Sequence, residues 1–465
     1  MSTRYAAGLP ATTTTGPATY AAPVAARPPG AHHGRMSLLD TARADVRLGR
    51  RLAVLRAGTL GLAALGDPVA RLFQAPWKGE PYAVYERLRC DRALTWSRSG
   101  IWVASTYDDA HAVLRDRRFG VRLANGQQPF DVTGGPVHEG TEPDVLEMSL
   151  LGLDPPDHGR LRRLATPAFS ARRIEAVRPQ VEATATRLLD ALDPSREPVD
   201  LVAAYASPLP VAVISDLLAV PPRDAGRFAA WGATLGASLD GVTSVAMHRR
   251  LLRAQADLRA LFERLVAERR RDPGDDLLSR LATAADRPDG ATADEVVALA
   301  QLLLLAGFET TTNLVGNALH ALLEDPDQLA LAVDDPGRAA QVVTETLRWD
   351  PPVQLTARVA HEPVRVGSVD VRRDQVVLVL LGSTGRDEAV HEDGEVFDLT
   401  RPEGRDTLAF SGGAHYCVGA PLARLEGEVA LRLLLERWPG VRRGGRSRPR
   451  GTTVIRGWRT LPVRA

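Results

Sequence analysis

One cysteine lies between a glycine-rich turn and the start of an apolar helix, in the stretch 408–426 (LAFSGGAHYCVGAPLARLE). The N–H groups of Val418, Gly419 and Ala420 have no partner within that helix and are expected to point back at the sulfur of Cys417. The positive end of the helix dipole favours a thiolate at this place. The glycines allow a tight turn and a close approach to a flat ligand. The pattern therefore indicates a thiolate that binds a soft or redox-active metal.

The alternative is a buried, inert cysteine, the usual state of one cysteine in an apolar context. It does not explain the glycines or the spacing of the aromatic, histidine and arginine residues around Cys417. The stretch resembles the haem-binding loop of the cytochrome P450 family, Phe-Gly-x-Gly-x-His-x-Cys-x-Gly, and matches it at Phe410, Gly413, His415, Cys417 and Gly419. It departs from the pattern at Ser411, which replaces the first glycine. The resemblance implies that Cys417 is the axial ligand of haem iron and that Phe410, His415 and Gly419 contact the cofactor, haem b.

Composition excludes several classes of protein. Of the 465 residues, 44% are hydrophobic and 25% are charged, which is typical of a soluble globular protein. The formal net charge of +1 gives no general electrostatic attraction to nucleic acid or membrane. There are 2 cysteines, so a metal bound to Cys417 leaves no disulfide pair. We therefore expect a cytoplasmic protein without a nucleic-acid partner.

The chain divides into three parts. Residues 1–35 are rich in Ala, Thr, Pro and Gly without an apolar period, which predicts a disordered tail and argues against a signal peptide. Residues 36–66 are predicted to form an amphipathic helical extension, whose apolar part is about half as long as a membrane span. This helix is expected to dock onto the body of the protein, with attachment to a membrane surface as the alternative. The resemblance covers 67–465, the expected catalytic domain, without a transmembrane segment.

Hydrophobic periodicity and turn residues predict the other elements. They are a helix over 82–89, a hairpin of strands 92–97 and 101–105, amphipathic helices over 172–270 with breaks near 208–210, 221–222 and 232–241, and strands over 364–371 and 376–381. The polar segment 121–150 is long for a loop, which favours a functional or mobile role. The resemblance implies that this segment covers the substrate pocket.

A long buried helix is expected at the centre of the molecule. Thr292 and Glu295 form a capping box, and the helical pattern continues for about 32 residues to Glu324. A glycine, an acid and three threonines interrupt its apolar centre, against helix propensity. Gly307 would let a flat ligand lie against the helix, although a glycine alone also suits a contact between helices. The resemblance implies that Glu309 and Thr310 deliver protons to bound dioxygen.

Several basic residues are expected to hold the propionates of the haem. His158 and Arg162 are four residues apart and share one helical face. The resemblance assigns both to the propionates, together with Arg358, whereas a solvated basic helix start is the alternative. Thr407 stands where many relatives have a histidine. Arg160 and Arg163, or one of them, are expected on another face of this helix, where they would bind an acidic electron donor.

A second motif is structural. Glu345 and Arg348 are three residues apart on a predicted helix, a spacing most often found in weak surface ion pairs. The resemblance implies instead a buried pair that is joined by Arg401.

These features together predict a mainly α protein with the cytochrome P450 fold, a helix-rich triangular prism with a smaller β-rich subdomain. We expect a monomeric monooxygenase that inserts one oxygen atom from dioxygen into an organic small molecule, with hydroxylation or epoxidation in secondary metabolism as its reaction. Its electrons would come from a ferredoxin and an NAD(P)H-dependent ferredoxin reductase. The alternatives are a peroxygenase that uses hydrogen peroxide and a docking domain without haem. The first is expected to lack the acid–threonine pair, and the second to lack the cysteine loop.

Overall fold

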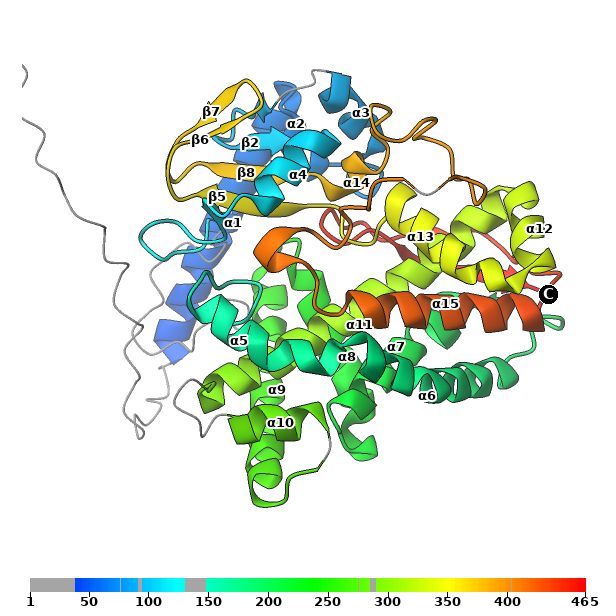
Figure 1. Ribbon diagram of the computed structural model, residues 1–465. Coiled ribbons are helices and arrows are strands. Elements are labelled where there is room, and N and C mark those ends of the chain that lie inside the picture. Colours follow the sequence, from blue (N-terminus) through cyan, green and yellow to red (C-terminus); the bar gives the residue numbers. More distant parts are fainter. Residues whose placement is uncertain are drawn as a thin grey trace, which may run out of the picture.

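The computed structural model describes residues 38–75, 77–90, 94–129, 148–274, 276–284, 290–402 and 404–465. The fold is mostly helical with small sheets, which confirms the expected fold class. Figure 1 shows the β-rich part at the top, the large helices below it, and the cysteine loop between the two parts, directly before α15. The predicted tail 1–35 and most of the segment 121–150 lie outside the described residues.

Fifteen α-helices are found in the described part of the chain. They are α1 (Leu38–Ala64), α2 (Pro68–Leu72), α3 (Tyr82–Cys90), α4 (Tyr107–Arg115), α5 (Asp157–Ala165), α6 (Ala171–Asp190), α7 (Pro208–Leu217), α8 (Pro222–Ser238), α9 (Val245–Arg271), α10 (Leu277–Ala284), α11 (Ala293–Glu324), α12 (Pro326–Asp334), α13 (Ala339–Trp349), α14 (Leu381–Thr384) and α15 (Ala420–Arg437). Shorter turns are the 3-10 helices Thr166–Phe169, Pro336–Arg338 and Gly413–His415 and the π-helix Val202–Ala206.

The strands are short. They are β1 (Thr95–Trp96), β2 (Trp102–Ala104), β3 (Phe119–Gly120), β4 (Val199–Asp200), β5 (Thr356–Ala360), β6 (Val364–Val366), β7 (Val369–Val371), β8 (Val376–Val379), β9 (Arg442–Arg443), β10 (Arg448–Pro449), β11 (Trp458–Thr460) and β12 (Pro462–Arg464). The largest sheet has the order β1-β2-β8-β5-β3, in which β2 and β8 are parallel and the other pairs are antiparallel.

The predicted central helix is confirmed as α11, with 32 residues and the expected capping box between Thr292 and Glu295. It packs against α7, α8, α9, α13 and α15. Among the described residues, α11 is the one helix long and apolar enough to cross a membrane, but 78% of its most apolar window is buried inside the molecule. Its hydrophobic surface is therefore explained by packing in the protein core.

The main sheet separates two smaller cores because successive strand residues point to opposite faces. Val377 and Val379 of β8 pack with α4 on one face, and Val376 and Leu378 pack with α3 on the other. The sheet thereby fixes β5, the strand that carries Arg358, between two packed layers.

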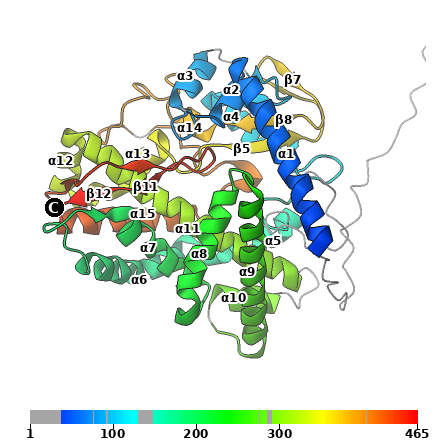
Figure 2. The same cartoon turned by 180° about the vertical axis from the view of Figure 1, so that it is seen from behind.

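The predicted helix over the extension is confirmed as α1, which Figure 2 shows running diagonally along the outside of the molecule. It contacts α2 and α9 and buries Leu48, Leu52 and Ala63. Arg56 also donates a hydrogen bond to the carbonyl of Thr243, two residues before α9 begins. These contacts support docking onto the body.

The predicted breaks near 208–210 and 221–222 are confirmed, since α7 and α8 begin there, and the break predicted around 232–241 begins only after Ser238. Pro208 begins α7, where a proline without an N–H fits the first helical turn. The helix α8 continues through Gly232 and Gly236 to Ser238. A Cβ on Gly232 would lie 3.0 Å from the ring of Phe308, and one on Gly236 would lie 2.6 Å from Glu309 Oε2. Both glycines therefore allow α8 to approach α11 and do not end the helix.

The predicted strand 364–371 is two strands. The hairpin of β6 and β7 turns at Gly367, whose φ of +56° suits glycine. The predicted hairpin after α3 is confirmed, because β1 pairs with β2 in antiparallel register.

Candidate active site

The cysteine loop is closed by its own backbone and by α5. The N–H of Cys417 donates to the carbonyl of Phe410 over 2.9 Å, so the chain between them forms a compact turn. Arg162 of α5 donates to the carbonyls of Ala414 and Tyr416 over 3.0 and 2.7 Å. The guanidinium therefore braces the loop from outside. The sequence predicted Arg162 beside a haem propionate and did not reveal these backbone contacts.

Two of the three expected amides reach the sulfur of Cys417. The N–H groups of Gly419 and Ala420 bond to it, whereas the structure gives no such bond for Val418. Burial raises the pKa of the Cys417 thiol, and the two amides and the charge of Arg162 oppose this effect without overcoming it. The helix start alone therefore does not ionise this thiol. A thiolate here needs a cation, which a metal ion supplies on binding.

His158 and His415 lie beside the cysteine loop with their ring centroids 4.3 Å apart. Burial and neighbouring positive charge lower the pKa of both imidazoles, to about 3 for His415. Nε2 of His158 is buried and has no hydrogen-bond partner among the described residues. This pair therefore presents at least one unused polar atom to any ligand bound here.

Arg358 completes a buried basic cluster, defined by Arg358, Arg162, His158 and His415. Its side chain is 4% exposed, and burial lowers its pKa to about 10. Its bonds go to neutral groups, which are Thr356 Oγ1, the Ala357 carbonyl and Ser411 Oγ. No carboxylate within the described ranges forms an ion pair with Arg358. A buried guanidinium without an anion is unfavourable, so this cluster suits a ligand with carboxylates.

One face of α11 is left uncovered at the centre of the molecule. Ala306 is exposed and Thr310 is half-buried, although most residues from 296 to 319 are buried. Thr310 Oγ1 donates to the carbonyl of Ala306 over 2.6 Å, a bond that a ligand can replace. For Gly307, the structure supports the stated alternative of a contact between helices. A Cβ there would lie 3.3 Å from Ile214 Cδ1, so this glycine permits the contact between α11 and α7.

Glu309 points away from the face of Thr310. Its carboxylate is 2% exposed and forms an ion pair with Arg450, which follows β10. Burial raises the pKa of Glu309, and the charge of Arg450 opposes the rise. The side chain of Arg450 is 24% exposed, so the pair connects the buried acid to the surface.

The structure also brings together the three residues expected to form a structural cluster. Arg348 makes a bidentate pair with Glu345 over 2.6 and 2.8 Å and donates to the carbonyls of Gly385, Gly394 and Val396. Arg401 Nε lies 3.5 Å from the same Glu345. The pair is buried, unlike most pairs at this spacing, and it holds the segment that leads to the cysteine loop.

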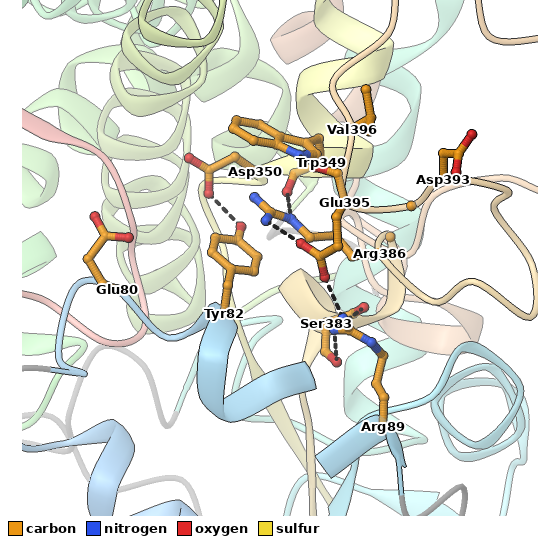
Figure 3. Close-up of polar contacts among 12 residues, drawn as sticks. Glu80, Tyr82, Arg89, Trp349, Asp350, Ser383, Arg386, Asp393, Glu395 and Val396 are labelled. Carbon is orange, nitrogen blue, oxygen red and sulfur yellow. Dashed lines mark hydrogen bonds and ion pairs between the residues drawn. The ribbon is translucent and has the colours of Figure 1, made fainter. Parts of the chain in front are cut away.

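A second polar network, which no sequence pattern indicated, extends this cluster. Figure 3 shows Arg386 bonded to the carbonyl of Trp349 and to Glu395, which also binds Arg89 of α3. The guanidinium of Arg386 lies between the rings of Tyr82 and Trp349, 3.4 and 4.3 Å from their centroids. These contacts join α3 to the C-terminal end of α13.

Comparisons with known proteins identify relatives over most of the chain. The sequence model described as "Cytochrome P450" matches residues 339–439, from α13 to just past α15. "Cytochrome P450 107B1" of Saccharopolyspora erythraea is 39% identical and covers 82% of this chain and 94% of its own. "6-deoxyerythronolide B hydroxylase" of the same organism is 37% identical over 84% and 96%. The ligand-free crystal structure of CYP164A2 from Mycobacterium smegmatis aligns with a TM-score of 0.77, at 36% identity, over 86% of this chain and 99% of that one.

Proposed function

The chain belongs to the cytochrome P450 family of haem-binding monooxygenases, and we propose that it hydroxylates or epoxidises an organic small molecule of secondary metabolism, with dioxygen as oxidant. Cys417, a buried thiol that accepts hydrogen bonds from two amides at the start of α15, is the observation that carries this proposal. The position oxidised and the secondary-metabolite class rest on likeness to relatives such as the hydroxylase described above.

The residues present fit haem b. Haem carries two propionate carboxylates, and the basic cluster contains a buried guanidinium without an acidic partner and an imidazole nitrogen without a hydrogen bond. We assign Arg358 and His158 to these carboxylates. Arg162 lies in the same cluster while it braces the loop, so it contributes charge to the propionates. Phe410 and Gly419 shape the loop around the sulfur, and Cys417 is the iron ligand. Thiolate-bound haem iron supplies the oxygen-activating chemistry.

Thr310 and Glu309 are proposed to manage protons from two sides of α11. The hydroxyl of Thr310 lies on the uncovered face and can turn from the Ala306 carbonyl to donate a hydrogen bond or hold a water. Glu309 lies on the other side, paired with Arg450, which reaches the surface. A proton that enters near Arg450 can pass through the Glu309 carboxyl to water beside Thr310.

The electron donor is proposed to be a ferredoxin, reduced by an NAD(P)H-dependent reductase. A hollow of about 620 Å³ lies on the outer side of Cys417 and is lined by Arg162, Arg163 and Tyr416. A neighbouring hollow of about 1050 Å³ is lined by Arg115, Arg117 and Arg405 together with Asp108 and Asp406, so its charged lining is positive on balance. This basic surface suits an acidic partner. Arg160, also expected there, is instead paired with Glu295 and Asp157.

The cysteine loop and Thr310 favour the monooxygenase over the two alternatives, the peroxygenase and the haem-free docking domain. A cytoplasmic, monomeric protein remains our proposal, as does the division into a tail, the extension and the catalytic domain 67–465.

The difference spectrum of the ferrous protein with carbon monoxide tests the iron ligand. Cys417→Ser is expected to lose the red-shifted thiolate band, because the loop contains no other cysteine. Cys90→Ser is the matched control and is expected to keep the band, since Cys90 is the exposed end of α3. A Cys417→Ser protein that retains the band would exclude this cysteine as the ligand.

A further inference from the structure

Ser411 is held in a backbone conformation that favours glycine. Its φ is +61°, and it is one of four residues other than glycine with positive φ in the described part of the chain. This region is unfavourable for a residue with a Cβ by roughly 1–2 kcal/mol. A glycine would adopt this φ without strain. The presence of a serine therefore indicates a role for its side chain.

The side chain of Ser411 contacts Arg358. Ser411 Oγ accepts a hydrogen bond from Arg358 Nη2 over 2.9 Å, across 53 positions of the chain. Since the oxygen acts as acceptor, the hydroxyl hydrogen remains available, and the structure gives no bond that Ser411 Oγ donates to another described residue. Ser411 is half-buried, so a ligand at Arg358 can reach the hydroxyl.

The other hydroxyl near this end of the loop is already used. Thr407 Oγ1 donates to the carbonyl of Leu347 over 3.0 Å and accepts from the N–H of Ala409 over 3.1 Å. It is therefore turned toward α13. Within the described ranges, Ser411 is the hydroxyl of this loop that contacts Arg358 and still has its hydrogen available to donate.

We propose that Ser411 anchors the haem in this chain: it orients Arg358 and donates a hydrogen bond to the propionate carboxylate that Arg358 binds. The inference rests on the proposed function, because it requires bound haem. A hydrogen bond from a hydroxyl to a carboxylate is charge-assisted and therefore stronger than one between neutral groups. The favourable contact in the loaded protein offsets the backbone strain at this position.

Two truncations separate the hydroxyl from the strain. Ser411→Ala removes the hydroxyl and keeps the strained φ, whereas Ser411→Gly removes both. We expect both variants to release haem to excess apomyoglobin roughly tenfold faster than the wild type, as a lost hydrogen bond to a charged group predicts. Asp393→Gly is the matched control, since Asp393 has a φ of +48° and an exposed side chain, which points away from the network in Figure 3. It is expected to leave haem release unchanged.

A pair of similar shape separates haem anchoring from a purely structural role. Asn and Asp both tolerate positive φ, but only Asn carries a donor. Ser411→Asn is expected to retain haem nearly as well as the wild type. Ser411→Asp would give Arg358 a carboxylate partner and repel the propionate, so haem release should be about 100-fold faster. If Ser411 served only to hold Arg358, the Asp variant would be as good as the wild type or better.

The reduction potential gives a second readout. Without the serine hydrogen bond, the propionate keeps more negative charge, which favours the ferric state. The midpoint potential of Ser411→Ala is therefore expected to be more negative than that of the wild type. Unchanged haem release and potential in the Ala and Gly variants, with the thiolate band intact, would overturn the inference while leaving the proposed function standing. Failure of the wild type to bind haem would overturn both.

Discussion

At the scale of single residues, the site combines groups whose chemistry depends on which side of a helix they occupy. Thr310 and Glu309 are adjacent in sequence, yet one lies on the uncovered face of α11 and the other is buried against Arg450. Adjacent helical residues point about 100° apart, so Thr310 and Glu309 lie on two sides of α11, the side proposed to face haem and the side that Arg450 connects to the surface.

The role of Thr310 in proton delivery is tested by the coupling of NAD(P)H use to product. Thr310→Ala is expected to leave haem content and substrate binding nearly unchanged, while peroxide rises and product falls. Glu309→Gln should slow turnover, because an amide cannot pass a proton as a carboxyl does; such groups contribute about 10²- to 10⁴-fold to rate. Product and peroxide per NAD(P)H are measured for both variants. Unchanged coupling in a stable Thr310→Ala protein would remove this role and favour the peroxygenase.

Glu426 of α15 is a buried acid that the proposed mechanism does not use. Burial raises its pKa to about 8, and a hydrogen bond with Thr311 of α11 opposes the rise. The folded protein therefore keeps a proton that the unfolded chain loses above its ordinary pKa near 4.5. The contribution to stability is fully present below that pH and is lost as the pH rises toward 8.

Glu426→Gln is expected to flatten this dependence, because the amide has no proton to lose. Between pH 5 and 8 the free energy of unfolding of the wild type should fall by up to roughly 1.4 kcal/mol per pH unit more than that of the variant. Urea unfolding of the haem-loaded proteins measures the difference. Glu428→Gln serves as control, since Glu428 pairs with Arg178 at half-buried positions. Equal slopes for wild type and Glu426→Gln would show that Glu426 is not protonated in the fold.

At the scale of elements, α5 directs three arginines to three different parts of the molecule. Arg160 pairs with Glu295 in the capping box of α11, over 2.6 Å. Arg162 braces the cysteine loop, and Arg163 is exposed beside the outer hollow. A single helix thus connects α11, the cysteine and the proposed docking surface.

Charge reversal on α5 tests the docking surface. Arg163→Glu is expected to slow reduction by an acidic ferredoxin and to weaken the salt dependence of the rate, because a favourable charge is lost from the interface. Arg160→Glu is the matched variant on the same helix: it should lower stability by breaking the pair with Glu295, with little effect on the rate. Stopped-flow reduction at several salt concentrations measures both. Equal rates for wild type and Arg163→Glu would place the donor elsewhere.

At the scale of the whole molecule, α1 lies across the outside, beside α2 and α9 (Figure 2). It buries Leu48 and Leu52 but exposes Val46, Val54 and Leu60, so its contact with the body is partial. A deletion series can therefore separate the tail from the helix.

Removal of residues 1–35 is expected to leave the melting temperature and haem content unchanged, since its composition cannot form a core. Removal of residues 1–64, which include α1, should lower the melting temperature because apolar surface on α9 loses its cover. Scanning calorimetry and the haem-to-protein ratio measure the series. Loss of haem in the shorter deletion would show that the tail packs on the body.

Local chemistry was sufficient to predict much of the fold and of the site. The capping box of α11, the hairpin after α3 and the helix that follows Cys417 depend on residues a few positions apart. Caps, turns and amphipathic periods act within such distances, so a single sequence contains them. The cysteine loop belongs to the same class, because its glycines and its cysteine are contiguous.

Tertiary structure alone decided which side chains meet across the chain. Arg450 reaches Glu309, Arg358 reaches Ser411, and Arg160 reaches Glu295, each over a separation that no local pattern records. An arginine side chain is long and can bind any acceptor within its reach, so its partner depends on how the surrounding elements pack. The same holds for Gly307. Its residue type indicated that another group approaches the helix closely at this position, but only the packing of α7 identified Ile214 as that neighbour.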